Sequence, residues 1–302
     1  MPPLRRSLPI RRPFDLLQSW RLVPLGRHDP TSQKRTHGFT WATRTPEGPA
    51  TIHAIQTEHT VDLDAWGSGA AWLLERAEAF TGLSDQPPVL EGSPVVHRLS
   101  REHASCRLLC LPNLYESLVR VILQQKITFG EACRGWGLLV GHHGDKAPGP
   151  FELMLPPEPA RAARIPSHAF TRMGIQRKMA DTIREVASRH RALERAAESR
   201  SPEALDALLQ RIRGIGPWTT GMTLGLYRGH ADAVILADFH LPNTVSYALT
   251  GTPRATDAQM LALLEPFRPH RMRVVRWIHA AGISAPRRGP RMAAQPLPGR
   301  RR

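Results

Sequence analysis

The sequence predicts a mostly α-helical protein with a small α+β domain near its N-terminal end. Three observations predict this fold class. Short β-branched and aromatic segments occur between residues 39 and 64, whereas apolar residues recur at helical spacing from about 98 to 285. Between these regions, residues 84–97 are rich in Pro, Gly and Ser, which is typical of a linker. We therefore expect a small α/β domain over residues 14–88 and a helical core over residues 89–285.

The small domain is expected to contain three strands followed by a helix. Pro46–Gly48 supplies a turn between the first two strands. Apolar residues then recur at helical spacing from Ala70 to Phe80, which predicts an amphipathic helix. The expected strands are Phe39–Thr45, Ala50–Gln56 and Thr60–Asp64.

Capping signals and apolar stripes place the helices of the core. Thr128 and Glu131 fit a capping box that begins one helix. Ser201 and Pro202 fit the N-cap and first residue of another helix, which is expected to stop at Gly214. The other expected helices are Arg172–Ala187, Met260–Phe267 and Met272–Ala280, together with a stripe formed by Leu114, Leu118 and Ile122.

The charge balance favours a polyanionic partner, most plausibly nucleic acid. The 302 residues carry a formal net charge of +15. Residues 1–13 hold four Arg and residues 286–302 hold six, with no acidic residue in either, so residues 14–285 carry only +5. Both ends are expected to be disordered basic tails. They either add sequence-independent affinity for phosphates or serve as solubilising ends.

The cysteines and the hydropathy pattern exclude several classes of protein. Cys106, Cys110 and Cys133 are an odd number without C-x-x-C spacing, so they support neither a disulfide framework nor a zinc site. The basic N-terminus lacks an apolar signal segment, and no apolar run reaches the ~20 residues of a membrane span. We expect a cytoplasmic, nucleoid-associated monomer with reduced thiols, no membrane association, and no metal or redox cofactor.

Two glycines, Gly214 and Gly216, mark a break between two helices, and Pro217 falls in the first turn of the second helix. Glycine accepts a positive φ, and without a Cβ it lets an outside group approach the backbone. The N–H groups of Gly214, Gly216 and Trp218 can then bind one phosphate at the positive end of the second helix, without reading the DNA sequence. This order is that of a helix-hairpin-helix. An ordinary helix–helix turn with a glycine cap is the alternative.

Downstream of this break, Asp238 follows the apolar residues 234–237 and precedes a new helix that has Pro242 in its first turn. An acid at the end of an apolar segment that faces a cleft can stay anionic and stabilise an oxocarbenium-like sugar cation. One carboxylate is enough when the leaving base is already cationic and needs little protonation. A simple N-cap is the alternative role of Asp238.

Together these segments resemble the helix-hairpin-helix DNA glycosylases. The resemblance is carried by IRGIGPWT at residues 212–219, DFHL at 238–241 and LVRVILQQKITFGEA at 118–132, in the order and spacing of that family. Residues 14–83 resemble, more weakly, the domain that precedes the core in the AlkA-type 3-methyladenine DNA glycosylases. The resemblance implies a hairpin that grips DNA and a catalytic role for Asp238.

Trp218 indicates the branch of this family. In the branches that also cleave the DNA strand, a nucleophilic lysine stands two residues after the second hairpin glycine, where this chain has Trp218. The alkylation-repair branch places tryptophan there as a wall of the base pocket, suited to stacking on a cationic base. Burial of Trp218 in the hairpin core is the alternative. Met222, one helical turn later, is expected to line the same pocket or the core.

The resemblance implies binding of double-stranded DNA that contains damaged bases. Gln125 and Lys126 lie at the junction where family members insert a wedge, and a phosphate or orphan-base contact is expected for them. Thr219 and Arg271 are expected to contact DNA as well. A monovalent cation held by hairpin carbonyls is compatible with the resemblance.

The function implied is hydrolysis of the N-glycosylic bond of alkylated bases of the 3-methyladenine type, in base excision repair and without AP lyase activity. Two alternatives stay open. One is a glycosylase for oxidised or deaminated bases. The other is a non-catalytic damage-sensing protein that keeps the DNA-binding scaffold, against which the intact Asp238 argues.

Overall fold

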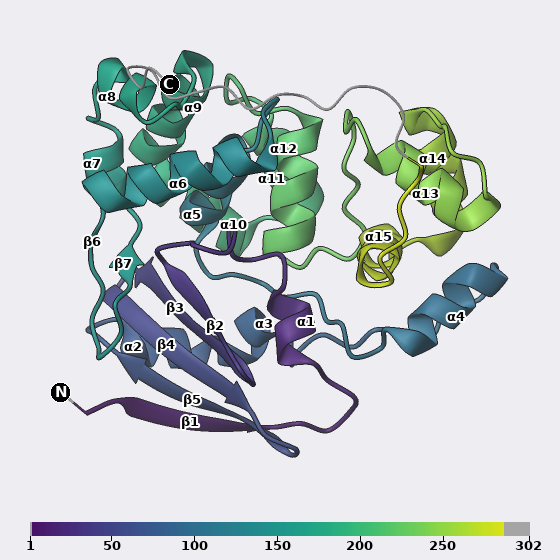
Figure 1. The fold of residues 1–302 in the computed structure, drawn as a ribbon, viewed down its shortest axis with the longest axis horizontal. Helices are drawn as coiled ribbons and strands as arrows, with labels where there is room; N and C mark the ends of the chain where they lie inside the picture. Colours follow the sequence, from purple (N-terminus) through teal and green to yellow (C-terminus); the bar gives the residue numbers. More distant parts are fainter. Residues whose placement is uncertain (1, 287–302) are drawn as a thin grey trace.

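The computed structural model describes residues 2–286, in which a five-stranded antiparallel sheet lies beneath a larger helical part (Figure 1). The strand order is β1-β5-β4-β3-β2, so the four strands from β2 to β5 form a meander and β1 adds to its far edge. The three expected strands are confirmed within β3, β4 and β5. The bounds are Leu4–Pro9 for β1, Ser32–Arg35 for β2, Gly38–Thr45 for β3, Gly48–Gln56 for β4 and Thr60–Trp66 for β5.

One face of the sheet is buried against three short helices, α1 (Leu16–Trp20), α2 (Ala70–Glu75) and α3 (Ala77–Thr81). Aromatic rings fill this layer. Trp20 stacks on Phe39 with ring centroids 3.6 Å apart, and Trp41 packs edge-on against Trp20. The helix expected from residue 70 to 80 is therefore two helices, which meet at Arg76.

The expectation of a disordered tail over residues 1–13 was wrong. Leu4–Pro9 form β1, which pairs with β5, and the side chain of Leu8 is buried. The arginines of this segment have folded partners: Arg5 pairs with Asp64, and Arg6 donates to the carbonyl oxygen of Leu74. A charge-rich edge strand lacks the apolar alternation that marks an inner strand, so the sequence pattern favoured a tail. Of the tail expected over 286–302, all but Pro286 lies outside the described residues.

The helical part follows an irregular segment and begins with α4. The expected capping box of Thr128 and Glu131 is confirmed at the start of α6, and Ser201 caps α11 as expected. Among the described residues, no helix is long and apolar enough to cross a membrane. The larger helices are α4 (Pro94–Glu102), α5 (Leu114–Ile122), α6 (Phe129–His143), α8 (Ser167–Arg172), α9 (Arg177–Ser188), α10 (His190–Ser199), α11 (Pro202–Leu209), α12 (Pro217–Met222), α13 (Leu241–Thr250), α14 (Asp257–Leu264) and α15 (Arg271–Ala280).

The remaining elements are small. A two-stranded ribbon of β6 (Asp145–Lys146) and β7 (Met154–Leu155) follows α6, and α7 (Pro159–Ala162) comes after it. A π-helical segment, Thr223–Tyr227, continues α12 without a break in the chain. A short 3-10 helix, Glu265–Phe267, precedes α15.

A fully buried ion-pair network fastens the sheet to the helical part. Arg120 in α5 donates to Asp29 at 2.7 Å and to Glu116 at 2.9 Å, and all three side chains are almost inaccessible to solvent. Glu116 also accepts a hydrogen bond from Thr43 in β3 at 2.7 Å, and Asp29 accepts one from Trp136 in α6 at 2.8 Å. Because α5 leads directly into the loop of Gln125 and Lys126, this network also fixes the base of that loop.

Candidate functional site

The two hairpin glycines have different surroundings. Gly214 has a φ of +91°, and a Cβ placed on it would lie 2.1 Å from the Oγ1 of Thr182 in α9. Both its conformation and its packing therefore require glycine. Gly216 is the N-cap of α12 in an extended conformation, with φ of −117°, and a Cβ there would meet no atom within 4 Å. Gly216 therefore has open space in front of the start of α12, where an outside group can approach.

Gln125 connects the loop between α5 and α6 to this hairpin. Its Nε2 donates to the carbonyl oxygen of Gly214 and to the Oγ1 of Thr219, both at 2.9 Å. The carbonyl oxygen of Arg213 accepts from Thr182 at 3.3 Å. These donors already occupy two hairpin carbonyls, and they compete with a monovalent cation for the same oxygens.

Lys126 stands at the exposed tip of the same loop. Its φ of +54° is the left-handed conformation, which is uncommon for a residue with a Cβ. Its ammonium group makes no hydrogen bond or ion pair with the described residues. Phe129, which begins α6 three residues later, leaves 59% of its surface exposed. A free cation and an exposed aromatic ring thus lie beside the hairpin.

Asp238 reaches the hairpin helix because the segment before it packs tightly on α12. A Cβ on Gly221 of α12 would lie 2.3 Å from the carbonyl oxygen of Val234, so only glycine allows this contact. Four residues further on, the Oδ2 of Asp238 accepts a hydrogen bond from the Nε1 of Trp218 at 2.8 Å. Gly221 is a signal that sequence reasoning overlooked, although a glycine inside a helix is costly enough to suggest a close approach.

The other carboxylate oxygen of Asp238 binds the start of α13. Its Oδ1 accepts from the backbone N–H groups of His240 and Leu241, both at 2.8 Å. Asp238 thus holds the start of α13 through two backbone N–H groups and also binds Trp218, while His240 occupies the N-cap position itself. The indole of Trp218 and the side chain of Met222 are half-buried. They pack against the hydrophobic core of the helical part and also against the core between the sheet and its short helices.

Two side chains beside Asp238 were not anticipated from the sequence. Phe239 exposes 82% of its surface. His279 in α15 is within electrostatic reach of Asp238, and its Nδ1 hydrogen-bonds the carbonyl oxygen of Val275 at 3.1 Å. Desolvation lowers the pKa of His279, and the hydrogen bond to the carbonyl oxygen of Val275 partly offsets this. The charge of Arg276 lowers the pKa further, and the charge of Asp238 raises it. Exposure and long-range proximity of this kind leave no periodic pattern in a sequence.

The overall fold is similar to that of known DNA glycosylases. The structure superposes with a TM-score of 0.77 on the 3-methyladenine DNA glycosylase of Archaeoglobus fulgidus, at 16% identity over 91% of this chain and 96% of that one. The chain has the helix-hairpin-helix DNA glycosylase fold. The Clostridium acetobutylicum 8-oxoguanine glycosylase/lyase in complex with DNA gives a TM-score of 0.69 at 12% identity, over 93% and 97% of the two chains.

A third glycosylase with this fold is smaller. The 3-methyladenine DNA glycosylase of Schizosaccharomyces pombe in complex with abasic DNA gives a TM-score of 0.53 at 19% identity, over 67% of this chain and 97% of that one. No family model matches the chain. No curated protein matches it either.

Within this glycosylase fold, the structure argues against two of the expected DNA contacts. Thr219 is only 2% exposed, and its hydroxyl oxygen accepts the hydrogen bond from Gln125. Arg271 is 9% exposed and binds Asp232 through its Nε at 2.9 Å and its Nη2 at 2.7 Å. A paired and buried guanidinium fixes the start of α15 and is not free to meet a phosphate. Trp277 of α15 is fully buried.

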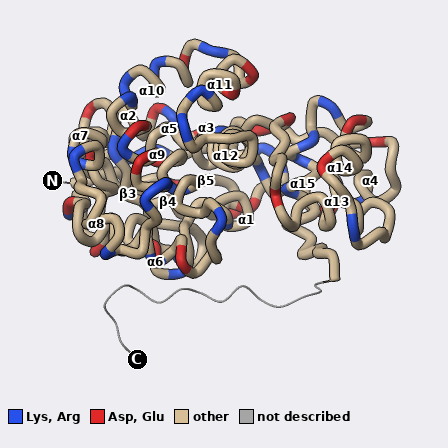
Figure 2. The backbone as a smooth tube through the Cα atoms, turned by 90° about the horizontal axis from the view of Figure 1, so that it is seen from above, with Lys and Arg blue, Asp and Glu red and all other residues tan. Residues whose placement is uncertain are grey.

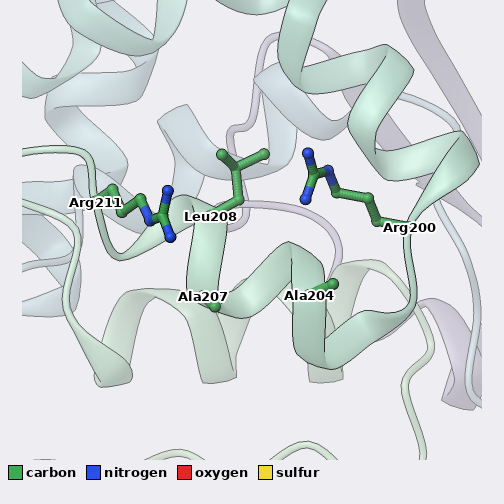
Figure 3. A pocket seen from close by; sticks show the side chains of 5 residues that line it. All are labelled: Arg200, Ala204, Ala207, Leu208 and Arg211. Carbon is green, nitrogen blue, oxygen red and sulfur yellow. The ribbon is translucent and has the colours of Figure 1, made fainter.

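Two hollows flank the first hairpin helix of the glycosylase fold. One lies beside α11, where Arg200 and Arg211 point toward each other with Leu208 between them (Figure 3). The other extends from α11 to Pro217 and Arg271. Basic residues lie along α10 and just beyond the end of α11 (Figure 2). Among residues 2–286, no three His, Cys, Asp or Glu side chains are grouped to hold a metal ion.

Proposed function

We propose that this protein is a monofunctional DNA glycosylase that hydrolyses the N-glycosylic bond of alkylated bases in double-stranded DNA. The observation that carries the proposal is the 2.8 Å hydrogen bond from the Nε1 of Trp218 to the Oδ2 of Asp238. It joins an aromatic ring and a carboxylate at the start of the hairpin helix. The coarser conclusion, a DNA glycosylase, is supported by the shared fold.

The chemistry of the two side chains matches the charges of this reaction. As the bond to the base breaks, positive charge develops on the sugar, and a fixed carboxylate stabilises that charge. Three N–H donors orient the carboxylate of Asp238 before the reaction starts. The face of Trp218 suits a positively charged alkylated base through a cation–π contact. Asp238 would also orient the attacking water, which leaves an abasic site.

The residue two positions after Gly216 supports hydrolysis without strand cleavage. Schiff-base chemistry requires a primary amine that attacks the sugar carbon. Trp218 has no such amine, and its indole nitrogen carries the proton donated to Asp238. Lys126 stands on the neighbouring loop, directly after Gln125.

The contacts with DNA follow from the open face of the hairpin. The N–H groups of Gly216 and Trp218 lie at the start of α12, where a phosphate can approach the backbone. Lys126 and Phe129 stand beside this point on the neighbouring loop. We propose that the target nucleotide swings out of the duplex between these contacts and Trp218. The protein would act as a monomer on nucleoid DNA in the cytoplasm.

Release of methylated purines from alkylated duplex DNA tests the proposal. The wild type should release base and leave unbroken strands with abasic sites, whereas Asp238→Asn should slow release by about 100-fold or more while still binding DNA. Asp206→Asn is the matched control, because Asp206 is a half-buried carboxylate on α11 whose side chain accepts from Gln210. Its release rate should equal that of the wild type.

Other outcomes separate the alternatives. If the wild type binds damaged DNA and releases no base, the protein is a damage-sensing module and the enzyme proposal fails. Faster release of an oxidised or deaminated base than of a methylated purine would overturn the substrate class. Strand cleavage by the wild type, trapped covalently by borohydride, would overturn the monofunctional mechanism.

A further inference from the structure

The peptide immediately before Asp238 has an unusual conformation. Ala237 has a φ of +58°, in the left-handed region that residues with a Cβ rarely adopt. Strained backbone of this kind persists only where its surroundings hold it in place, and it clusters at functional sites. The direction in which the carboxylate of Asp238 points depends on the backbone angles of this preceding residue. A contact that fixes Ala237 therefore also sets the direction of Asp238.

One side chain supplies this contact. The backbone N–H of Ala237 donates to the Oδ2 of Asp257 at 2.8 Å. Asp257 is the first residue of α14, directly after Thr256, which forms a capping box with Gln259. Both halves of the capping box are present, so the start of α14 is fixed by its own hydrogen bonds.

A second contact joins the start of α14 to α13. The Oδ1 of Asn243 accepts from the backbone N–H of Ala255 at 3.0 Å. The carboxylate of Asp257 is thereby held by a rigid pair of helices, α13 and α14, and Asp238 holds the start of the first of them. Hydrogen bonds therefore connect Ala237 to the start of α14 and Asp238 to the start of α13.

We propose that Asp257 is a positioning residue for the glycosylase reaction. It holds Ala237 in the left-handed conformation, and so it aims the carboxylate of Asp238 at Trp218 and at the sugar of the flipped nucleotide. Asp257 acts only through the backbone and does not contact substrate. The expected effect of Asp257 on the rate of base release rests on the proposed function. Its expected effect on the hydrogen bond between Trp218 and Asp238 does not depend on that function.

The sharpest test removes the carboxylate and then removes the strain. Asp257→Ala should slow single-turnover base release by about 10- to 100-fold, because a displacement of about 1 Å is costly to a preorganised site. Its affinity for abasic-site DNA should not change. Adding Ala237→Gly should restore part of the rate, since glycine adopts this φ without a steric cost. Asp257→Asn, which keeps a side-chain oxygen as acceptor, should stay near the wild type.

A matched control separates positioning from helix capping. Glu203 is an acid in the first turn of α11, as Asp257 is in the first turn of α14. Glu203→Ala should leave the rate of base release unchanged. If Asp257→Ala behaves like Glu203→Ala, or if its rate loss follows its melting temperature and Ala237→Gly restores nothing, the positioning role is overturned.

A readout without catalysis keeps the inference testable on its own. Hydrogen exchange of the indole N–H of Trp218, assigned in the spectrum through Trp218→Phe, reports directly on its bond to Asp238. Exchange should speed up in Asp257→Ala and slow again when Ala237→Gly is added. Unchanged exchange would overturn the inference whether or not the protein releases base, whereas an inactive wild type with faster exchange in Asp257→Ala would overturn the proposed function alone.

Discussion

The indole N–H of Trp218 and the carboxylate of Asp238 meet at 2.8 Å, although 20 residues separate them in the chain. The contact joins α12 of the hairpin to the loop that begins α13. It fixes the plane of an aromatic ring and the direction of a carboxylate with a single bond. Any group that stacks on the ring is therefore held at a set distance from the negative charge.

Replacing Trp218 by Phe should test this bond without removing the aromatic ring. A hydrogen bond to a charged group contributes roughly 1.5–3 kcal/mol, so base release by Trp218→Phe should slow by about 10- to 100-fold. Because a ring remains to stack on the base, KM should change little. Single-turnover kinetics with methylated DNA would measure both. Trp72→Phe, which alters a ring that lies under Arg76 on α2, should have no effect on the rate.

The hairpin glycines should respond differently to alanine. Gly214→Ala meets both a positive φ and the Oγ1 of Thr182, so it should lower the melting temperature and the affinity for DNA. Gly216→Ala meets no protein atom within 4 Å and should leave the melting temperature unchanged. Its new methyl group would still obstruct an approaching phosphate, so affinity for undamaged duplex DNA should fall. Equal affinity of Gly216→Ala and wild type would place the phosphate elsewhere.

Acid should weaken the protein through Asp29. Burial raises the pKa of Asp29, but the guanidinium of Arg120 and the donors from Leu25 and Trp136 outweigh it and hold that pKa below its ordinary 3.8. A carboxylate whose folded pKa is depressed stabilises the fold above its unfolded pKa, and this stability is lost as the pH falls through the folded value. The free energy of unfolding should therefore decline below about pH 4.

Asp29→Ala isolates this contribution. It leaves the charge of Arg120 buried without this partner, which costs about 3–5 kcal/mol at neutral pH. Urea unfolding from pH 7 to pH 3 should show lower stability for Asp29→Ala throughout and a shallower decline in acid. Asp64→Ala, which breaks the exposed pair with Arg5, should cost no more than about 1 kcal/mol. Equal losses for the two variants would contradict the weight given to the buried network.

His279 should impose a second pH dependence, on the rate. Desolvation lowers the pKa of His279 below 6.5, so the ring is neutral at pH 7 and gains a proton only in more acidic solution. An imidazolium near Asp238 would repel a cationic base and offset the carboxylate charge. Release of a cationic alkylated base should therefore slow as the pH falls below 6.5. His279→Gln should lose this acid-side decline, and an unchanged profile in that variant would assign the decline to another group.

Local patterns in the sequence were sufficient to predict the parts of the site that lie close together along the chain. The hairpin from Gly214 to Trp218 could be predicted because glycine and proline between two apolar stripes interrupt a helix and mark a turn between two helices. Asp238 could be identified because it ends an apolar segment and begins a helix. The meeting of Trp218 with Asp238 could not, since it depends on Gly221 packing against Val234.

The errors have a common physical cause. Arg271 was expected to reach DNA, but the fold brings it to 2.7 Å from Asp232, which lies 39 residues earlier in the chain. Thr219 was expected to contact DNA because its neighbours in the sequence do not reveal that Gln125 binds its hydroxyl group. Leu4–Pro9 resembled a tail because its cations find their acids 59 or more residues away. Charge pairing across long separations leaves no trace in local composition.

The buried network around Arg120 makes the sheet-bearing part and the helical part depend on each other. Asp29 and Thr43 belong to the sheet-bearing part, whereas Arg120 and Glu116 belong to α5. Cutting the chain between the parts would leave the buried pair of Arg120 and Glu116 without Asp29 and Thr43, so both charges would lose hydrogen bonds. The sheet is therefore not a detachable module. A shortened relative could dispense with it only by replacing the arginine as well.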